Sequence, residues 1–320
     1  MTTEQTRTVR VVQARWEADG VVSLRLRAGD GTPLPPWEPG AHLDLVLPSG
    51  SVRQYSLCGE PDSADYTVAV LREAAGRGGS AELHDTALVG RELRIRGPRN
   101  RFELEPARRY VFVAGGIGIT PLLAMIRRVA ARGLPWELHY GGRRRDTLAF
   151  TRELTALAER SVGELHLRSD DVEGPLPLTE IVRGAPAGAM LYACGPGGLL
   201  TALAGTVERE NPALALRFER FTAAPAEPAP GGAAFDVELA RTGGSVTVQP
   251  GQSILDAVRQ KLPDVLYSCE EGFCGTCETK VLEGEPVHRD TLLSPKERAK
   301  NTTMMICVGG CASARLVLDL

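Results

Sequence analysis

Apolar and polar residues alternate in short runs along the N-terminal part of the chain, and glycine and proline separate these runs. The apolar residues Val22, Leu24 and Leu26, for example, stand at every second position. A period of two residues is typical of strands that bury one face. Further runs of this kind cover residues 42–47, 52–57, 66–71 and 92–96. Short, regularly spaced strands predict an antiparallel β-barrel over residues 1–105, interrupted by one helix over residues 80–86.

Residues 106–224 show a different pattern, in which continuous apolar runs alternate with amphipathic stretches. The runs predict strands over residues 110–114, 137–140, 164–166 and 190–194, and the stretches predict helices over residues 122–131, 151–158 and 199–210. This alternation predicts a doubly wound α/β domain, in which ligands bind at the carboxyl ends of the strands. The turns at residues 115–121 and 194–196 follow predicted strands, so we expect both to bind a ligand.

Residues 225–233 are rich in proline, alanine and glycine, a composition that is typical of a linker. Residues 234–320 then contain a predicted hairpin, a helix that Ser253 caps, and several short strands, which together predict a small α+β domain. The predicted fold class is therefore multidomain: an antiparallel β-barrel, a doubly wound α/β domain and an α+β domain. A length of 320 residues agrees with two or three domains.

The composition is that of a globular protein, with 43% hydrophobic and 24% charged residues. A net charge of −3 provides no basic field that would attract nucleic acid. The chain has no apolar run of about 18 residues, so we expect no membrane span. The N-terminal sequence lacks the features of a signal peptide, and seven cysteines fit a reducing compartment, so we expect a cytoplasmic protein and, by default, a monomer. The five histidines show no metal-ligand spacing.

The strongest chemical motif is a run of cysteines in the last domain. Cys269, Cys274 and Cys277 have the spacing C-x4-C-x2-C, and Cys307 follows in a later segment. This is the spacing of plant-type [2Fe–2S] clusters, in which four thiolates hold two irons. Glycines within the loop allow its backbone to turn sharply. The motif therefore predicts a one-electron redox centre.

A zinc site fits these cysteines less well, because it would need a second pair of cysteines or histidines at a matching distance, and His288 stands alone. The fourth ligand of the cluster has two candidates, Cys307 and Cys311. Cys307 ends an apolar run at residues 304–306, which would hold it rigidly. We therefore predict that Cys307 is the ligand, and Cys311 stays the alternative.

Two stretches of the barrel have the chemistry of phosphate and ring binding. Arg53 and Tyr55 share one face of a predicted strand, and they offer a phosphate ligand and a flat aromatic surface, while Ser56 adds a hydroxyl. Residues 76–80 place glycine amides before a predicted helix, where anions bind. Each stretch alone is better explained as a strand face or a turn. Together, upstream of a redox cluster, they favour a bound flavin phosphate.

The glycine turn at residues 115–121 departs from the full dinucleotide-binding pattern, because Pro121 replaces the third glycine and no acidic residue ends the second strand. Arg143, Arg144 and Arg145 follow that strand instead. These arginines could meet ribose or phosphate oxygens, or form a solvated loop. The turn alone is therefore a weak indication of a nicotinamide site, and the choice between NADH and NADPH stays open.

The order of these motifs resembles that of the phthalate dioxygenase reductase family, which includes vanillate demethylase reductases. The sequence has Arg-x-Tyr-Ser, then Gly-Gly-Ile-Gly-Ile-Thr-Pro, Cys-Gly-Pro and a plant-type cluster loop, so that the resemblance covers nearly the whole chain. It implies FMN on the barrel, NADH on the α/β domain and a [2Fe–2S] cluster in the last domain. It also implies electron transfer to a Rieske-type oxygenase or, as in some relatives, to a cytochrome P450.

The resemblance further implies roles for particular residues. The flavin phosphate would lie against Arg53, Gly78, Gly79 and Ser80, and its ring against Tyr55, Ser56 and Phe221. The pyridine nucleotide would lie against Gly115, Gly116, Gly118, Thr120, Pro121 and Arg143, with its nicotinamide near Cys194, Gly195 and Pro196. Ser56 and Cys194 would be the catalytic residues, next to the position of hydride transfer.

The number of electrons agrees with this set of cofactors. A nicotinamide gives up two electrons as one hydride, a [2Fe–2S] centre accepts one electron, and a flavin can do both. The barrel shows no evident adenine site, which favours FMN over FAD. The competing class is an iron–sulfur sensor or carrier without turnover, and the flavin and dinucleotide motifs argue against it.

Overall fold

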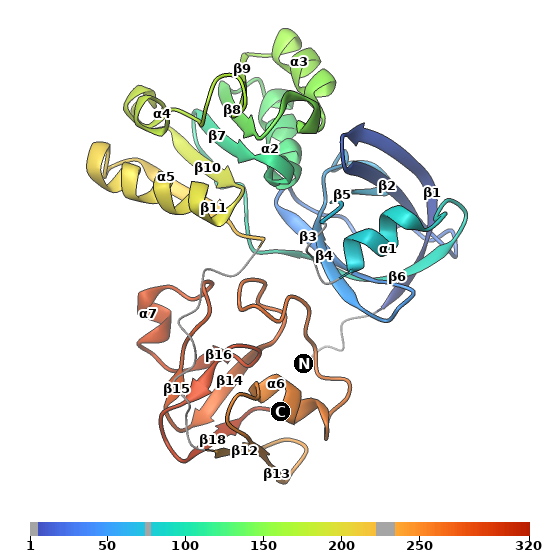
Figure 1. Ribbon diagram of the computed structural model, residues 1–320, viewed down its shortest axis with the longest axis vertical. Coiled ribbons are helices and arrows are strands. Elements are labelled where there is room, and N and C mark those ends of the chain that lie inside the picture. The colour runs from blue at the N-terminus through green and yellow to red at the C-terminus, as the bar shows by residue number, and fades with distance from the viewer. Residues whose placement is uncertain (1–5, 74–77, 222–233) are drawn as a thin grey trace. The chain divides into compact units, whose positions relative to one another are not determined.

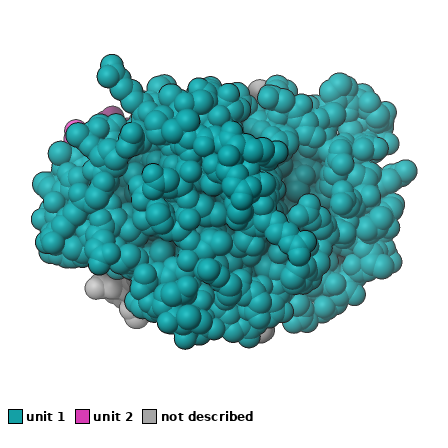
Figure 2. Space-filling view, turned by 90° about the horizontal axis from the view of Figure 1, so that it is seen from above, with its two compact units in different colours: residues 1–221 teal, residues 222–320 magenta. Residues whose placement is uncertain are grey.

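The computed structural model describes residues 6–73, 78–221 and 234–320. The chain forms two compact units, Met1–Phe221 and Thr222–Leu320, which are coloured separately in Figure 2. The predicted linker at residues 225–233 lies outside the described residues, as do Gly76 and Arg77 of the predicted phosphate-binding stretch. The first unit contains both the barrel and the α/β domain (Figure 1), and the boundary between them at residue 105 stays a prediction.

Six antiparallel strands and one helix form the barrel. The strands follow the order β4-β3-β6-β1-β2-β5 in the sheet. Their bounds are Arg7–Ala18 (β1), Val21–Ala28 (β2), Ala41–Val46 (β3), Val52–Ser56 (β4), Tyr66–Leu71 (β5) and Glu92–Asn100 (β6), and helix α1 covers Gly79–Asp85. The sheet curls so that its two edges meet, because Leu57 pairs with Val68 and the amide of Cys58 donates to the carbonyl of Thr67 at 2.9 Å. The predicted strand pattern is confirmed.

The α/β domain has five parallel strands in the order β11-β10-β7-β8-β9. The strands are Tyr110–Gly115 (β7), Trp136–Gly142 (β8), Gly163–Ser169 (β9), Met190–Cys194 (β10) and Ala215–Glu219 (β11). The helices are Ile119–Ala131 (α2), Thr151–Arg160 (α3), Leu178–Gly184 (α4) and Gly197–Glu210 (α5), with short 3₁₀ turns at Gly116–Gly118 and Arg145–Thr147. The doubly wound fold is as predicted, whereas α4 and β11 have no counterpart among the predicted elements.

Strand β7 lies at the centre of this sheet, and all its residues are buried. Tyr110, Phe112 and Ala114 belong to the core that α2 and α3 form with one face of the sheet. Val111 and Val113 belong to the core that α4 and α5 form with the other face. Burial on both faces explains why the sequence of this strand is continuously apolar rather than alternating.

The side chain of Arg127 connects the barrel with the α/β domain. It extends from α2, donates to the backbone carbonyl of Cys58 in the barrel, and bonds the carboxylate of Glu153 from α3 with an Nε–Oε1 distance of 2.6 Å. Glu60 of the barrel lies 3.2 Å from the same Nε. The guanidinium is largely buried, so these charge-assisted bonds form out of water, where they are stronger.

The second unit is a small α+β fold. A sheet in the order β13-β12-β18-β14-β16 is accompanied by the short pair β15-β17. The strands are Phe235–Leu239 (β12), Ser245–Val248 (β13), Glu278–Glu283 (β14), Pro286–Val287 (β15), Thr303–Met305 (β16), Gly310–Cys311 (β17) and Arg315–Leu318 (β18), and the helices are Ile254–Arg259 (α6) and Pro295–Arg298 (α7). Ser253 caps α6 as predicted, since its hydroxyl accepts the amide of Asp256 at 3.0 Å.

The helices of the described residues are too short or too polar to cross a bilayer.

Candidate functional site

Two glycine turns meet at the carboxyl ends of β7 and β10. The first ends β7 and leads into α2, and the second lies between β10 and α5. A Cβ atom on Gly118 would lie 2.2 Å from the carbonyl oxygen of Cys194, and one on Gly115 would lie 2.7 Å from Cδ of Pro196. Glycine is therefore needed at both positions for the turns to pack so closely. The structure thus brings together the two turns that the sequence singles out.

The first turn presents its backbone to the carboxyl edge of the sheet. Gly116 adopts the left-handed φ of 53°, with open space where its Cβ would be. Thr120 is buried, and its hydroxyl donates to the carbonyl of Ile117 at 2.9 Å, so this side chain fixes the shape of the turn. Pro121 lies in the first turn of α2, where a backbone amide has no partner within the helix. The N-terminus of this helix is suited to binding a phosphate.

Ser56, Cys194 and Glu219 come together between the barrel and the sheet. Cys194 and Glu219 are register partners in the parallel pair of β10 and β11, and Ser56 is the last residue of β4. The Ser56 hydroxyl forms a hydrogen bond with the Glu219 carboxyl, and Glu219 in turn contributes to the raised pKa of Cys194. Ser56 and Cys194 are predicted site residues, whereas Glu219 is a residue that the sequence analysis does not identify. The feature of the sequence that could have identified Glu219 is its position at the carboxyl end of a strand, two residues before Phe221.

This group of side chains is held without charge at neutral pH. Burial raises the pKa of the Glu219 carboxyl to about 8, although the hydrogen bond from Ser56 acts in the opposite direction. The Oε2 atom of Glu219 is buried and has no hydrogen-bond partner within the described residues. Burial also raises the pKa of Cys194 well above its ordinary value, with a smaller contribution from Glu219. Cys194 therefore stays a thiol and Glu219 stays mostly protonated at neutral pH.

Arg53 and the start of α1 lie against each other. A Cβ atom on Gly79 would lie 2.8 Å from both Cγ and Nε of Arg53, so a larger residue there would displace this arginine. Gly78 precedes the helix with a left-handed φ of 83°. The hydroxyl of Ser80 accepts the amide of Glu73 at 3.0 Å. The two predicted phosphate-binding stretches are thus neighbours in space, although Gly76 and Arg77 of the second lie outside the described residues.

Two aromatic residues, Tyr55 and Phe221, are predicted to contact a flavin ring. Tyr55 is half-buried and packs against the core of the barrel, and burial raises the pKa of its phenol to about 12. Phe221 is half-buried and packs against the core that includes Cys194. Both aromatic residues are thus partly accessible in the same compact unit.

The three arginines after β8 differ in their surroundings. Arg144 bonds Asp19 at 2.5 Å and Asp146 at 2.9 Å. Arg145 lies 3.9 Å from Glu173. Arg143 is exposed, and within residues 6–73, 78–221 and 234–320 it forms no ion pair. Arg143 is therefore the arginine of this loop that is available to an incoming anion.

Four cysteine thiols converge in the second unit. Cys269 lies within hydrogen-bonding reach of Cys274 and of Cys307, and Cys307 lies within reach of Cys277. All four residues are buried. The thiol of Cys269, together with burial, raises the pKa of Cys274. Buried thiols this close together are the donor set of an iron–sulfur cluster, which binds them as thiolates.

The backbone of the loop supports these sulfur atoms. The amide of Glu271 donates to Sγ of Cys269 at 3.3 Å, and the amide of Thr276 donates to Sγ of Cys274 at 3.4 Å. Gly272 has a φ of 74°, and a Cβ atom there would lie 3.0 Å from Cα of Asp290. Amide donors of this kind hold the sulfur atoms in place and tune the potential of a cluster.

Cys311, the alternative fourth ligand, is engaged elsewhere. Its thiol donates to the carbonyl of Ser313 at 2.8 Å and lies 3.2 Å from the hydroxyl of the same residue. The structure therefore groups Cys307, rather than Cys311, with the three cysteines of the loop.

Two family models match the chain. Residues 112–204 match the oxidoreductase NAD-binding domain, and residues 237–309 match the 2Fe-2S iron-sulfur cluster binding domain. The second match includes Cys307 and ends before Cys311. The matches agree with the positions of the glycine turns and of the cysteine loop.

Relatives and solved structures match nearly the whole chain. A putative toluene-4-sulfonate monooxygenase system reductase subunit from Comamonas testosteroni is 44% identical and covers 98% of both chains. The solved phthalate dioxygenase reductase is 35% identical, with a TM-score of 0.73 and coverage of 98% of both chains. An intact type IV self-sufficient cytochrome P450 monooxygenase is 40% identical with a TM-score of 0.86, and this chain covers 41% of that longer protein. The chain therefore belongs to the phthalate dioxygenase reductase family of oxidoreductases, which combine an NAD-binding domain with a [2Fe–2S] domain.

Proposed function

We propose that the protein is the reductase component of an oxygenase system, and that it passes electrons from NADH through FMN and a [2Fe–2S] cluster to a Rieske-type terminal oxygenase. The observation that carries this proposal is the presence, in one chain, of four converging cysteine thiols and of the neutral group formed by Ser56, Cys194 and Glu219. The cysteine thiols are suited to one-electron transfer, and the neutral group lies where the barrel and the α/β domain meet.

The barrel would hold the flavin. Arg53 would bind its phosphate beside the start of α1, and Tyr55 and Ser56 would lie along its ring. The close approach of Arg53 to Gly79 supports this assignment, because it brings a guanidinium to the start of α1. The absence of an evident adenine site in the sequence of the barrel favours FMN over FAD.

The α/β domain would hold the nicotinamide cofactor. The backbone of Gly116 and Gly118 at the start of α2 would meet the pyrophosphate, and Cys194, Gly195 and Pro196 would lie near the nicotinamide. Among the described residues, Arg143 is the one exposed arginine of the loop after β8 that forms no ion pair. The loop therefore offers limited positive charge for the 2′-phosphate of NADPH. This arrangement favours NADH, as the family resemblance also implies.

A bound flavin would supply the chemistry that connects a two-electron hydride donor with a one-electron [2Fe–2S] centre. Ser56, Cys194 and Glu219, where the two domains meet, would position the flavin and nicotinamide rings and exclude water. Their side chains would stay protonated. Hydride transfer needs no general base, which agrees with the raised pKa values of Glu219 and Cys194. Cys269, Cys274, Cys277 and Cys307 would hold the cluster.

A cytochrome P450 is the second candidate acceptor. The structural match to a self-sufficient P450 monooxygenase favours it, because in that protein a region similar to this chain is joined to the rest of a P450 enzyme. The two acceptors can be separated by mixing the NADH-reduced protein with a purified Rieske oxygenase or with a purified P450, and measuring the rate of metal reduction in each.

The first experiment is an absorption spectrum of the purified protein before and after anaerobic addition of NADH, followed by mass spectrometry of the extracted flavin. We expect flavin and iron–thiolate bands that both bleach, and an extracted mass equal to that of FMN. A cluster without flavin that NADH leaves unchanged would contradict the proposal and favour a sensor or carrier.

Arg53→Ala should weaken FMN binding by about tenfold or more. The matched variant Arg10→Ala, at an exposed arginine that pairs with Glu92, should bind FMN normally.

A further inference from the structure

The tripeptide Glu-Leu-His occurs twice in the α/β domain, on neighbouring strands. Residues 137–139 lie on β8 and residues 164–166 on β9. The parallel register places Glu137 opposite Glu164 and His139 opposite His166. The leucine between each pair packs into the core formed with α2 and α3, so both acids and both histidines point to the other face of the sheet.

The side chains on that face form a tight cluster. Nε2 of His139 lies 2.7 Å from Oε1 of Glu137, and Nε2 of His166 lies 3.3 Å from the same oxygen. The two imidazole rings stack, with centroids 4.7 Å apart and planes inclined by 13°. Oε2 of Glu164 lies 3.7 Å from Nε2 of His166. Two imidazole nitrogens thus face one carboxylate oxygen, and a second carboxylate is within reach.

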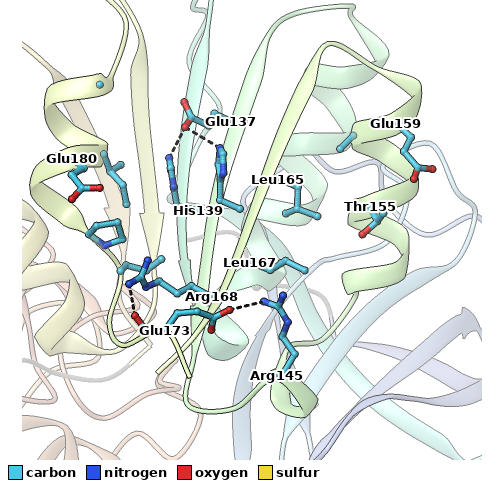
Figure 3. Close-up of a pocket in the computed structure, with 16 residues that line it drawn as sticks. Glu137, His139, Arg145, Thr155, Glu159, Leu165, Leu167, Arg168, Glu173 and Glu180 are labelled. Atoms are coloured by element: carbon cyan, nitrogen blue, oxygen red, sulfur yellow. Dashed lines mark hydrogen bonds and ion pairs between the residues drawn. The ribbon is translucent and has the colours of Figure 1, made fainter. Parts of the chain in front are cut away.

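A pocket of about 820 Å³ gives solvent access to this cluster. The pocket follows the edge strand β9, and its lining includes Glu137, His139 and His166. Figure 3 shows the carboxylate of Glu137 beside His139, while Thr155 and Glu159 extend from α3 well away from them. His139 is the fourth of seven residues of β8, about 10 Å from the carboxyl end of the strand at 3.3 Å per residue. The cluster is therefore separate from the glycine turns that would bind the nicotinamide cofactor.

We propose that Glu137, His139 and His166 form a binding site for a divalent transition metal ion of the zinc class, with Glu164 as a possible fourth ligand. Two imidazoles and a carboxylate are a common ligand set for Zn²⁺. The three ligand atoms lie within 4.8 Å of one another. In a tetrahedral site with bonds of about 2.0–2.1 Å, ligand atoms lie about 3.3 Å apart. The 3.3 Å between His166 and Glu137 already matches, and the 2.7 Å between His139 and Glu137 needs to open by about 0.6 Å.

The surroundings agree with a cation at this position. The carboxylate of Glu137 lies within 3.3 Å of both imidazole nitrogens, so a cation bound between them would meet a negative charge. His139 is largely buried and His166 is half-exposed, so one ligand is fixed by packing and the other can turn toward an incoming ion. A bound ion would link β8 to β9, the edge strand of the sheet.

The test is a calorimetric titration of the cluster-loaded reductase with Zn²⁺, in a Cys311→Ser background that removes a partly accessible thiol. The visible spectrum reports that the iron–sulfur cluster stays intact. We expect one Zn²⁺ per chain and a loss of affinity of about tenfold or more in His166→Gln, because a direct ligand should matter at least as much as the outer partners of a metal site. The control Glu159→Gln, which changes an exposed acid lining the same pocket, should bind Zn²⁺ like the parent.

A second measurement locates the ion. Anomalous scattering at the zinc edge from crystals grown with Zn²⁺ should place the ion between His139 and His166. The proposal is overturned if the parent binds no Zn²⁺, if His166→Gln and His139→Gln both bind it unchanged, or if the anomalous signal lies elsewhere. His166 is half-exposed, so its variant should fold even if the more buried His139 variant does not.

Discussion

The raised pKa of Glu219 makes the stability of the first unit depend on pH in a defined direction. The folded protein keeps a proton on this carboxyl between its ordinary pKa of 4.5 and about 8, whereas the unfolded chain releases it. The protonated carboxyl therefore contributes most to the free energy of unfolding below pH 4.5. This contribution is lost as the pH rises toward 8. Glutamine has the shape of the protonated acid but does not titrate, so Glu219→Gln should remove the loss.

The size of the effect follows from the shift. A change of about 3.5 units at 1.36 kcal/mol per unit gives an upper limit of about 5 kcal/mol. Part of the residue is accessible, so we expect about 2 kcal/mol after solvent screening. For a unit of 221 residues, 1 kcal/mol changes the melting temperature by about 2–4 °C. The variant should therefore melt about 4–8 °C above the parent at pH 9 and close to it at pH 5.

The assay is thermal unfolding of the first unit, followed by circular dichroism at both pH values with flavin in excess. Glu208→Gln, at an exposed acid of α5, is the control and should melt like the parent at both pH values. An equal difference between Glu219→Gln and the parent at pH 5 and pH 9 would refute the reasoning, because it would mean that Glu219 does not titrate differently in the folded state.

Two further predictions concern the cluster and the glycine turns. Cys307→Ser should lose most of the iron and of the iron–thiolate absorption, whereas Cys311→Ser should retain both, as iron analysis of the purified variants would show; equal retention would contradict the assignment of Cys307. Gly118→Ala should lower the affinity for NADH and destabilise the fold by about 1–3 kcal/mol, because its Cβ would lie 2.2 Å from the carbonyl oxygen of Cys194. The control Gly198→Ala lies in α5 with no atom within 4 Å of its added Cβ, so NADH titration and denaturant unfolding should show unchanged affinity and equal or higher stability.

The sequence predicts those parts of the fold that local patterns determine. Alternation predicts the barrel strands, continuous apolar runs predict the buried parallel strands, and the capping role of Ser253 follows from its position before an apolar helix. Helix α4 and strand β11 are missed for local reasons as well. Helix α4 has only seven residues, and β11 is an edge strand whose residues are largely accessible, so neither has a strong hydrophobic pattern.

The candidate sites show a similar limit. The cysteine spacing alone predicts the three cysteines of the loop as ligands, since a short loop brings them together. Glu219 is not identifiable in this way, because its meeting with Ser56 depends on how the barrel packs against the sheet. His139 and His166 show no metal-ligand spacing along the chain, and they meet only because two parallel strands place them in register. Contacts of this kind depend on tertiary structure, which a pattern in one segment does not contain.

The buried contacts of Arg127 have a thermodynamic consequence. Because this side chain of α2 bonds the Cys58 carbonyl and the Glu60 carboxylate of the barrel, unfolding of either domain alone would break these bonds, so that each domain stabilises the other. The barrel and the α/β domain should therefore melt in a single cooperative transition. A ligand that binds only the barrel would then raise the free energy of unfolding of the α/β domain by the same amount. The concentration of flavin in the cell would therefore also determine what fraction of the α/β domain stays folded.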